Sequence, residues 1–199
     1  MKKLKKIVIA AGLILSMSSF TFANKSEAAT THKVQYGETY WKIATKYGVP
    51  INNLLKVNNT NSTALYAGQN IVIPNSTISA TDKDLLARLV RAEAEGEPYA
   101  GKVAVATVIL NRVKHPDFPS TVRNVIYQID SGYYAFTPVQ NGSINKPADA
   151  ISKKAVNEAI AFSGKGNGSL YFYNPKTAKS DWILSKKVTL TIGNHRFAK

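Results

Sequence analysis

Apolar residues recur at helical spacing after residue 84, and a single carboxylate falls among them. Four aliphatic residues define one face of the predicted helix: Leu85, Leu86, Leu89 and Val90. At about 100° per residue, Glu93 falls close to the centre of that face. An ionised carboxylate on an apolar face is costly unless it is paired or lines a cleft, so we expect the pKa of Glu93 to rise. A general acid that works near neutral pH needs such a pKa. The alternative is that the helix ends at Glu93 and the side chain turns to solvent.

The same periodicity organises the rest of residues 83–199. The helix that carries Glu93 is expected to be capped by Thr81 or Asp82 and to end near Glu95. Helices are also predicted over residues 101–113 and 148–162. Their expected core positions are Val103, Ala106, Ile109, Leu110, Val113, Ile151, Ala155, Ala159 and Phe162. Residues 170–173 and 188–192 have the pattern of β-strands, so the sequence predicts an α+β domain with a helical first half and a small β-sheet.

Residues 31–74 predict a smaller unit of strand, helix, helix and strand. The expected elements cover residues 33–36, 39–47, 51–57 and 69–73. The expected core is Val34, Ile43, Ala44, Leu54, Leu55, Val57, Leu65, Ile71 and Ile73. A unit of this size more often binds than catalyses. Residues 75–82 are rich in Ser and Thr, without apolar periodicity, and are predicted to be a linker.

The first residues indicate export. A start with four lysines precedes an apolar run, and Ser26, Glu27 and Ala28 form a small-x-small cleavage site, so residues 1–28 are predicted to be a secretory signal peptide. The alternative, a retained membrane anchor, is disfavoured because the apolar run is short and contains several hydroxyl residues.

The net charge and the absence of cysteine limit the classes of partner and of functional site that the protein can have. The chain has no cysteine, which excludes cysteine nucleophiles and cysteine-ligated metal sites. The net charge is +14, and residues 1–28 hold five lysines and one glutamate, which leaves +10 for the remainder. Such an excess favours a polyanionic partner, which in an exported protein is an acidic wall polymer rather than nucleic acid. The three histidines lie far apart in sequence, so no zinc site and no cofactor is predicted.

The smaller unit resembles a LysM domain. The motif residues are Gly37-Glu38-Thr39, Asn58, and Gly68-Gln69 before a strand that ends at Pro74. The resemblance implies a βααβ fold that binds N-acetylglucosamine polymers through two loops. The corresponding residues are Gly37, Glu38, Thr39, Tyr40, Asn61, Leu65 and Tyr66. Tyr40 and Tyr66 have flat apolar faces suited to sugar rings, although either ring can instead be a core or surface aromatic.

The larger unit resembles the SleB-type cell wall hydrolases, the spore cortex-lytic family. Four ordered blocks carry the match: ARLVRAEAEGEPYAGKVAVATVILNRV, AFTPVQNGSI, LYFYNP and IGNHRF. The resemblance implies a fold related to lysozyme and lytic transglycosylases, with Glu93 as the catalytic glutamate. Family members cleave peptidoglycan between N-acetylmuramic acid and N-acetylglucosamine. The same glutamate would first act as acid and then as base, closing a 1,6-anhydro ring.

Further residues are candidates for a glycan cleft. Aromatic and amide side chains suited to stacking and hydrogen bonding are Tyr134, Phe136, Gln140, Tyr171, Tyr173, Asn174 and Trp182, with His195 added by its block. Each of them alone is more often a core or surface residue. Ordinary glycoside hydrolases need a second carboxylate. The candidates for it are Glu95, Glu97, Asp117 and Asp130.

The resemblances together indicate a secreted enzyme associated with the cell wall or the spore envelope. It is expected to act on peptidoglycan as a monomer, in sporulation or germination. Two alternatives stay open: a hydrolytic muramidase or glucosaminidase of the same fold, and an inactive wall-binding protein.

Overall fold

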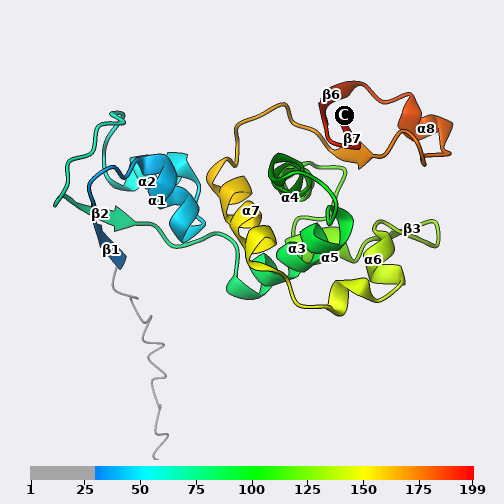
Figure 1. Cartoon of the computed structure of the whole chain (residues 1–199), viewed down its shortest axis with the longest axis horizontal. Helices are drawn as coiled ribbons and strands as arrows, with labels where there is room; N and C mark the ends of the chain where they lie inside the picture. The colour runs from blue at the N-terminus through cyan, green and yellow to red at the C-terminus, as the bar shows by residue number, and fades with distance from the viewer. Residues whose placement is uncertain (1–29) are drawn as a thin grey trace, which may run out of the picture.

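The computed structural model describes residues 30–199, and the predicted signal peptide lies outside them. The N-terminal unit consists of β1 (Thr30–Lys33), α1 (Tyr40–Tyr47), α2 (Ile51–Val57) and β2 (Asn70–Ile73). The two strands pair antiparallel, with Thr30 opposite Ile73 (Figure 1). The predicted βααβ order is therefore confirmed.

Two details of the N-terminal unit differ from the prediction. The first strand begins at Thr30 and ends at Lys33, because the following residues form a turn in which Gly37 has a φ of 77°. Val57, expected in the core, is 40% exposed at the end of α2. Asn58 joins α2 to β2: its Nδ2 donates to the carbonyls of Leu54 and Val72, and its Oδ1 accepts from the Val72 N–H, each at 2.8 Å.

Three long helices form the core of the larger unit. They are α3 (Ala80–Glu93), α4 (Tyr99–Lys114) and α7 (Ala150–Ala161). Short elements lie between α4 and α7 in sequence: α5 (Val122–Ile126), β3 (Ile129–Asp130), β4 (Tyr133–Tyr134), α6 (Thr137–Gln140) and a 3₁₀ turn, η1 (Ser143–Asn145). Of these, α5 and η1 contribute buried residues to the same core, whereas the hairpin of β3 and β4 is exposed. The aliphatic arc predicted on α3 is confirmed, because its four residues are fully buried. Among the described residues, no helix is long and apolar enough to span a membrane.

A three-stranded antiparallel sheet completes the larger unit. It contains β5 (Tyr171–Tyr173), β6 (Val188–Ile192) and β7 (His195–Ala198) in the order β5-β7-β6, and α8 (Asp181–Leu184) lies between β5 and β6 in sequence. The sequence pattern predicted β5 and β6 within one residue but missed β7. This central strand begins with two polar residues, His195 and Arg196, so its sequence does not indicate that Phe197 is buried.

Details of the larger unit also differ from the prediction. Helix α3 begins at Ala80, because the Ser79 side chain caps it by accepting from the Asp82 N–H, so the connecting segment is shorter than residues 75–82. The helix ends at Glu93 rather than near Glu95. Ile151, expected in the core, lies in the first turn of α7 and is 57% exposed.

The two units pack directly against each other through α1 and α7 (Figure 1). Lys83 of α3 donates from Nζ to the Gly48 carbonyl at 2.9 Å, at the end of α1. Trp41 and Phe162 meet edge to face with ring centroids 6.1 Å apart, and Ala161 belongs to the core of the N-terminal unit. The short connection and these contacts hold the N-terminal unit on the larger one.

Candidate active site

Glu93 is the last residue of α3, and its side chain is half-buried. Burial raises its pKa to about 7, and the nearby cation of Arg112 opposes that rise. The helix ends at Glu93, as the alternative interpretation expected. The side chain is nevertheless partly removed from solvent, as its position on the apolar face of the helix predicts. About half of such carboxyl groups carry a proton at neutral pH.

A buried lysine holds the end of α3. Lys102 of α4 is 8% exposed, and its Nζ donates to the Ala94 carbonyl and, at 3.3 Å, to the Glu95 carbonyl. Both carbonyls directly follow the last residue of the helix, where backbone carbonyls lack donors from within the helix. A cation there also complements the negative end of the helix dipole. Lys102 therefore fixes the backbone next to Glu93.

Arg112 is the residue of this site that the sequence reasoning missed. It lies on α4 and is 9% exposed, and its Nε donates to the Leu170 carbonyl at 2.7 Å. Its guanidinium carbon lies 4.9 Å from the ring centroid of Phe118, 5.3 Å from that of Phe136 and 5.6 Å from that of Tyr171. Burial lowers its pKa to about 10, so it stays charged at neutral pH. The sequence feature that could have identified Arg112 is its position within the apolar run that ends at Val113.

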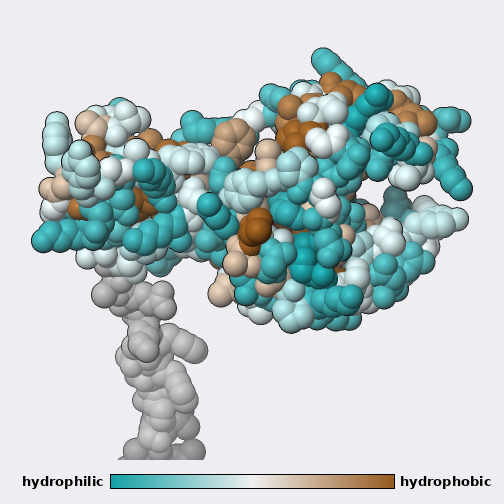
Figure 2. Space-filling view, viewed as in Figure 1, coloured by the Kyte–Doolittle hydropathy of each residue, from teal (hydrophilic) through white to brown (hydrophobic). Residues whose placement is uncertain are grey.

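Tyr171, one of the rings at this cation, leads to exposed aromatic residues. Tyr171 of β5 meets Trp182 of α8 at right angles, with centroids 5.1 Å apart, and Trp182 is 55% exposed. Lys186 Nζ lies 4.3 Å from the Trp182 centroid. Tyr134, 44% exposed, lies on the β3–β4 hairpin. Figure 2 shows the surface indented between the part that carries α8 and the part that carries this hairpin.

The other predicted cleft residues are placed differently. Phe136 and Tyr173 are 4% and 7% exposed, so both act mainly in packing. Gln140 is exposed on α6, and Asn174 accepts a hydrogen bond from the Lys176 N–H in a turn. His195 is half-buried against Phe172 and Phe197, burial lowers its pKa, and its Nδ1 has no partner among the described residues.

The candidate second carboxylates are engaged or exposed elsewhere. Glu97 accepts two hydrogen bonds from Asn194, one from the backbone N–H at 3.0 Å and one from Nδ2 at 3.1 Å. Asp117 lies 3.6 Å from His115 Nδ1, and Asp130 accepts from Ser131 Oγ. Glu95 is exposed. Within residues 30–199, no carboxylate contributes to the pKa shift of Glu93, and no cluster of acidic and histidine residues could hold a metal ion.

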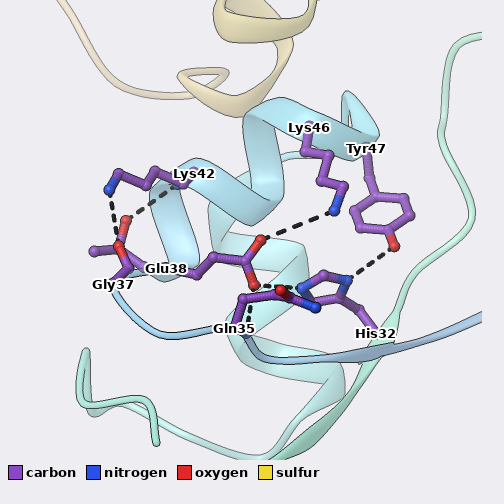
Figure 3. Close-up of polar contacts among 8 residues, drawn as sticks. His32, Gln35, Gly37, Glu38, Lys42, Lys46 and Tyr47 are labelled. Carbon is purple, nitrogen blue, oxygen red and sulfur yellow. Dashed lines mark hydrogen bonds and ion pairs between the residues drawn. The ribbon is translucent and has the colours of Figure 1, made fainter. Parts of the chain in front are cut away.

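In the loop after β1, which was predicted to bind glycan, the polar side chains form hydrogen bonds within the N-terminal unit (Figure 3). Glu38 accepts from His32 Nε2 at 2.6 Å and from the Gln35 N–H at 2.8 Å, and these bonds hold the pKa of Glu38 below its usual value. Thr39 caps α1. Tyr40 is 3% exposed in the core, which corrects its expected role as a stacking surface.

Exposed groups remain on both predicted loops of the N-terminal unit. Tyr66 is 74% exposed, and Tyr36, not predicted, is 98% exposed beside Gly37. A hollow of about 500 Å³ is bounded by residues of α2 and by Asn59, Thr60 and Asn61. Leu65 is half-buried and packs against the core. The second loop therefore retains the groups that could contact a sugar.

Two parts of the chain match known families. Residues 96–198, just over half of the 199-residue chain, match the family described as Cell Wall Hydrolase. The chain belongs to this cell wall hydrolase family. Residues 32–74 of the chain match the LysM domain, and these bounds agree closely with the N-terminal unit.

Curated relatives of the chain are named spore cortex-lytic enzymes. That of Halalkalibacterium halodurans is 43% identical over 119 residues, which are 60% of this chain and 35% of the relative. That of Bacillus cereus is 43% identical over 127 residues, which are 64% of this chain and 47% of the relative. The chain thus spans less than half the length of these relatives.

A solved structure supports the fold of the larger unit. The catalytic domain of the germination-specific lytic transglycosylase SleB from Bacillus anthracis is 42% identical, with a TM-score of 0.57. The match covers 64% of this chain and 100% of the SleB domain. The predicted fold class, a LysM unit before a lytic-transglycosylase-like domain, is confirmed.

Proposed function

We propose that this protein cleaves peptidoglycan glycan strands between N-acetylmuramic acid and N-acetylglucosamine, as a lytic transglycosylase. The observation that carries this proposal is Glu93, a half-buried carboxyl group with a pKa of about 7 beside the buried cation of Arg112. The family match begins after Glu93, at residue 96, so the role of Glu93 is argued from its surroundings. The solved SleB domain, which is 42% identical, is a lytic transglycosylase, and this likeness supports the same reaction class.

The reaction needs one group that gives and then takes a proton. Protonated Glu93 donates its proton to the glycosidic oxygen as the bond to the muramoyl C1 breaks. The resulting carboxylate is stabilised by the charge of Arg112. It then removes the proton of the muramoyl C6 hydroxyl, whose oxygen bonds to C1 and closes the 1,6-anhydro ring. Glu93 ends protonated, ready for the next cycle.

The surroundings of Glu93 favour this route over hydrolysis. Hydrolysis by the usual routes requires a second carboxylate as nucleophile or as base for water. Within the described part of the chain, the charged neighbour that shifts the pKa of Glu93 is a cation, and the four candidate carboxylates lie exposed or bound elsewhere. An intramolecular hydroxyl as nucleophile removes the need for that second group.

The LysM domain and the overall charge support action at the wall. We propose that the LysM domain binds N-acetylglucosamine-containing strands through its second loop and the exposed rings of Tyr36 and Tyr66. Export through the predicted signal peptide would bring the enzyme to the cell wall or the spore envelope. The excess of basic residues supports attraction to the anionic polymers found there.

The chemical outcome is tested by mass spectrometry of the products released from purified peptidoglycan. Transglycosylation yields 1,6-anhydromuramoyl ends, each one water lighter than the reducing ends formed by hydrolysis. Anhydro ends support the proposal, and reducing ends would replace it with a muramidase or glucosaminidase. A folded protein that releases neither product from vegetative wall or spore cortex would be a wall-binding protein.

The LysM proposal predicts a loss of binding when an exposed ring is removed. Tyr66→Ala is expected to weaken binding to insoluble peptidoglycan about threefold to tenfold, since an aromatic stacking contact contributes about 0.5–1.5 kcal/mol. Co-sedimentation in a Glu93→Gln background measures it without degradation. Tyr127→Ala, which removes a 39%-exposed ring on the other domain, is the matched control. Equal binding by both variants would contradict a role for Tyr66.

A further inference from the structure

A basic hollow lies where the LysM domain meets the catalytic unit. It measures about 580 Å³ and is formed by α1 on one side and α7 on the other. Each helix contributes two lysines, Lys42 and Lys46 from α1 and Lys153 and Lys154 from α7. Neither Glu93 nor Arg112 lines it, so it is separate from the candidate active site.

The four lysines are only weakly neutralised by their neighbours. Lys46 Nζ lies 3.9 Å from Glu38 and Lys153 Nζ lies 3.9 Å from Asp84, both at the outer limit of an ion pair. Lys42 donates to the Gly37 carbonyl at 2.8 Å. Lys154 Nζ lies 5.4 Å from the ring centroid of Tyr99. The hollow therefore keeps a positive potential.

The remaining lining groups point to a ligand with oxygen acceptors. Glu158 is the one acidic residue among the described residues that line the hollow, and its Oε2 accepts a hydrogen bond from Tyr99 Oη at 2.7 Å. Thr45 also lines it, and its hydroxyl oxygen is buried with no hydrogen-bond partner within residues 30–199. A buried hydroxyl without a partner is costly unless a ligand or water satisfies it.

We propose that this hollow binds the phosphodiester groups of an acidic cell-wall polymer. Planar carboxylates are best matched by the fork of arginine, whereas lysine binds phosphate as a compact point charge. The four basic residues of the hollow are lysines, spread over two helices, which suits a chain of separate single charges. The inference rests on the proposed function in one respect, because only action at the wall brings such a polymer to the enzyme.

The ligand would bridge the two domains. Lys42 and Lys46 belong to the LysM domain, while Lys153 and Lys154 belong to the helix that packs on it. A polymer bound between them would add to the affinity that the LysM domain has for glycan, because the two contacts share one molecule. The hollow would thus direct the enzyme to wall regions that carry phosphate polymers.

Binding of poly(glycerol phosphate) tests the proposal. The chain has two tryptophans, so Trp182→Phe leaves Trp41, which lines the hollow, as the fluorescent reporter. In this background we expect a saturable change in Trp41 fluorescence that weakens as salt concentration rises. Replacing the four lysines of the hollow by glutamine is expected to lower the affinity by at least about tenfold, since each contact contributes modestly.

A charge-matched variant separates a site from general attraction. Glutamine at four exposed lysines outside the hollow removes the same charge and is expected to change the affinity less than about twofold. These control residues are Lys33, Lys165, Lys187 and Lys199. If the fourfold variant of the hollow does not fold, Lys153→Gln with Lys154→Gln alters only α7 and is expected to lower the affinity by about threefold.

Two results would overturn the inference. Equal losses in the hollow and control variants would assign the binding to the general basic charge. Tighter binding of poly(glutamate) than of poly(glycerol phosphate) would assign the hollow to carboxylates. Neither result depends on glycan cleavage, so failure of this inference is distinguishable from failure of the proposed reaction.

Discussion

Glu93→Gln is expected to lower the rate of glycan cleavage by about a thousandfold or more, because a positioned general acid contributes about 10²–10⁴ and this residue acts twice. Glutamine keeps the size of the side chain but can neither donate the proton to the glycosidic oxygen nor accept one from the C6 hydroxyl. The fold is expected to persist, because no hydrogen bond of Glu93 within residues 30–199 is lost. Release of soluble muropeptides from purified peptidoglycan measures the rate, and thermal unfolding checks the fold.

Glu95→Gln is the matched control for this prediction. Glu95 lies two positions further along the chain, is exposed, and has no role in the proposed reaction. We expect its activity to stay within about twofold of the parent, as most exposed substitutions do. A Glu93→Gln protein that retains a tenth of the parent rate, or a Glu95→Gln protein that loses as much as Glu93→Gln, would remove Glu93 from its proposed role.

Arg112→Met is expected to move the pH dependence of cleavage. The reaction requires protonated Glu93, so in the parent kcat/KM should fall about tenfold per pH unit above about 7. Arg112 is charged in this range and favours the carboxylate, which lowers the pKa of Glu93. Removing that cation raises this pKa, and the alkaline limb is expected to shift upward by about one pH unit.

The same substitution is expected to lower stability. Met leaves the partly buried Leu170 carbonyl without the donor that Arg112 Nε provides, at a cost of about 1–3 kcal/mol in the free energy of unfolding. Chemical denaturation measures this loss. Arg112→Lys retains the charge but not the planar donor fork, so it should lose stability while keeping the alkaline limb near pH 7. A limb that stays at pH 7 in Arg112→Met would show that Arg112 does not act on Glu93.

The elements predicted best are those with strong local signals. The three long helices follow from apolar periodicity, and their bounds differ by a few residues where a cap decides them, as Ser79 does for α3. Helical phase also singled out Glu93 as a candidate, because a charge on an apolar face is recognisable from the sequence. The strand β7 was missed, since only its pairing between β5 and β6 makes its pattern meaningful.

Site residues were predicted less well than elements, because aromatic identity does not reveal exposure. Trp182 and Tyr66 are exposed as a stacking role requires, whereas Tyr40 and Tyr173 have the same residue chemistry and are buried. Arg112 was missed because its partners come from β5, from the segment at Phe118 and from the segment before α6. These contacts join residues far apart in the chain, and the bond to Leu170 alone spans 58 positions.

The sequence by itself determined the order of the two domains, the α+β class, the helix that presents Glu93 and the family resemblance, since each depends on residues close together in the chain. Only the tertiary structure decided what surrounds Glu93, because the buried cation of Arg112 and the lysine at the end of α3 both come from another helix. It also decided that the LysM domain packs on α7 and encloses a basic hollow there. The physical reason is that burial, pKa shifts and shared surfaces depend on distances in space, which spacing along the chain does not determine.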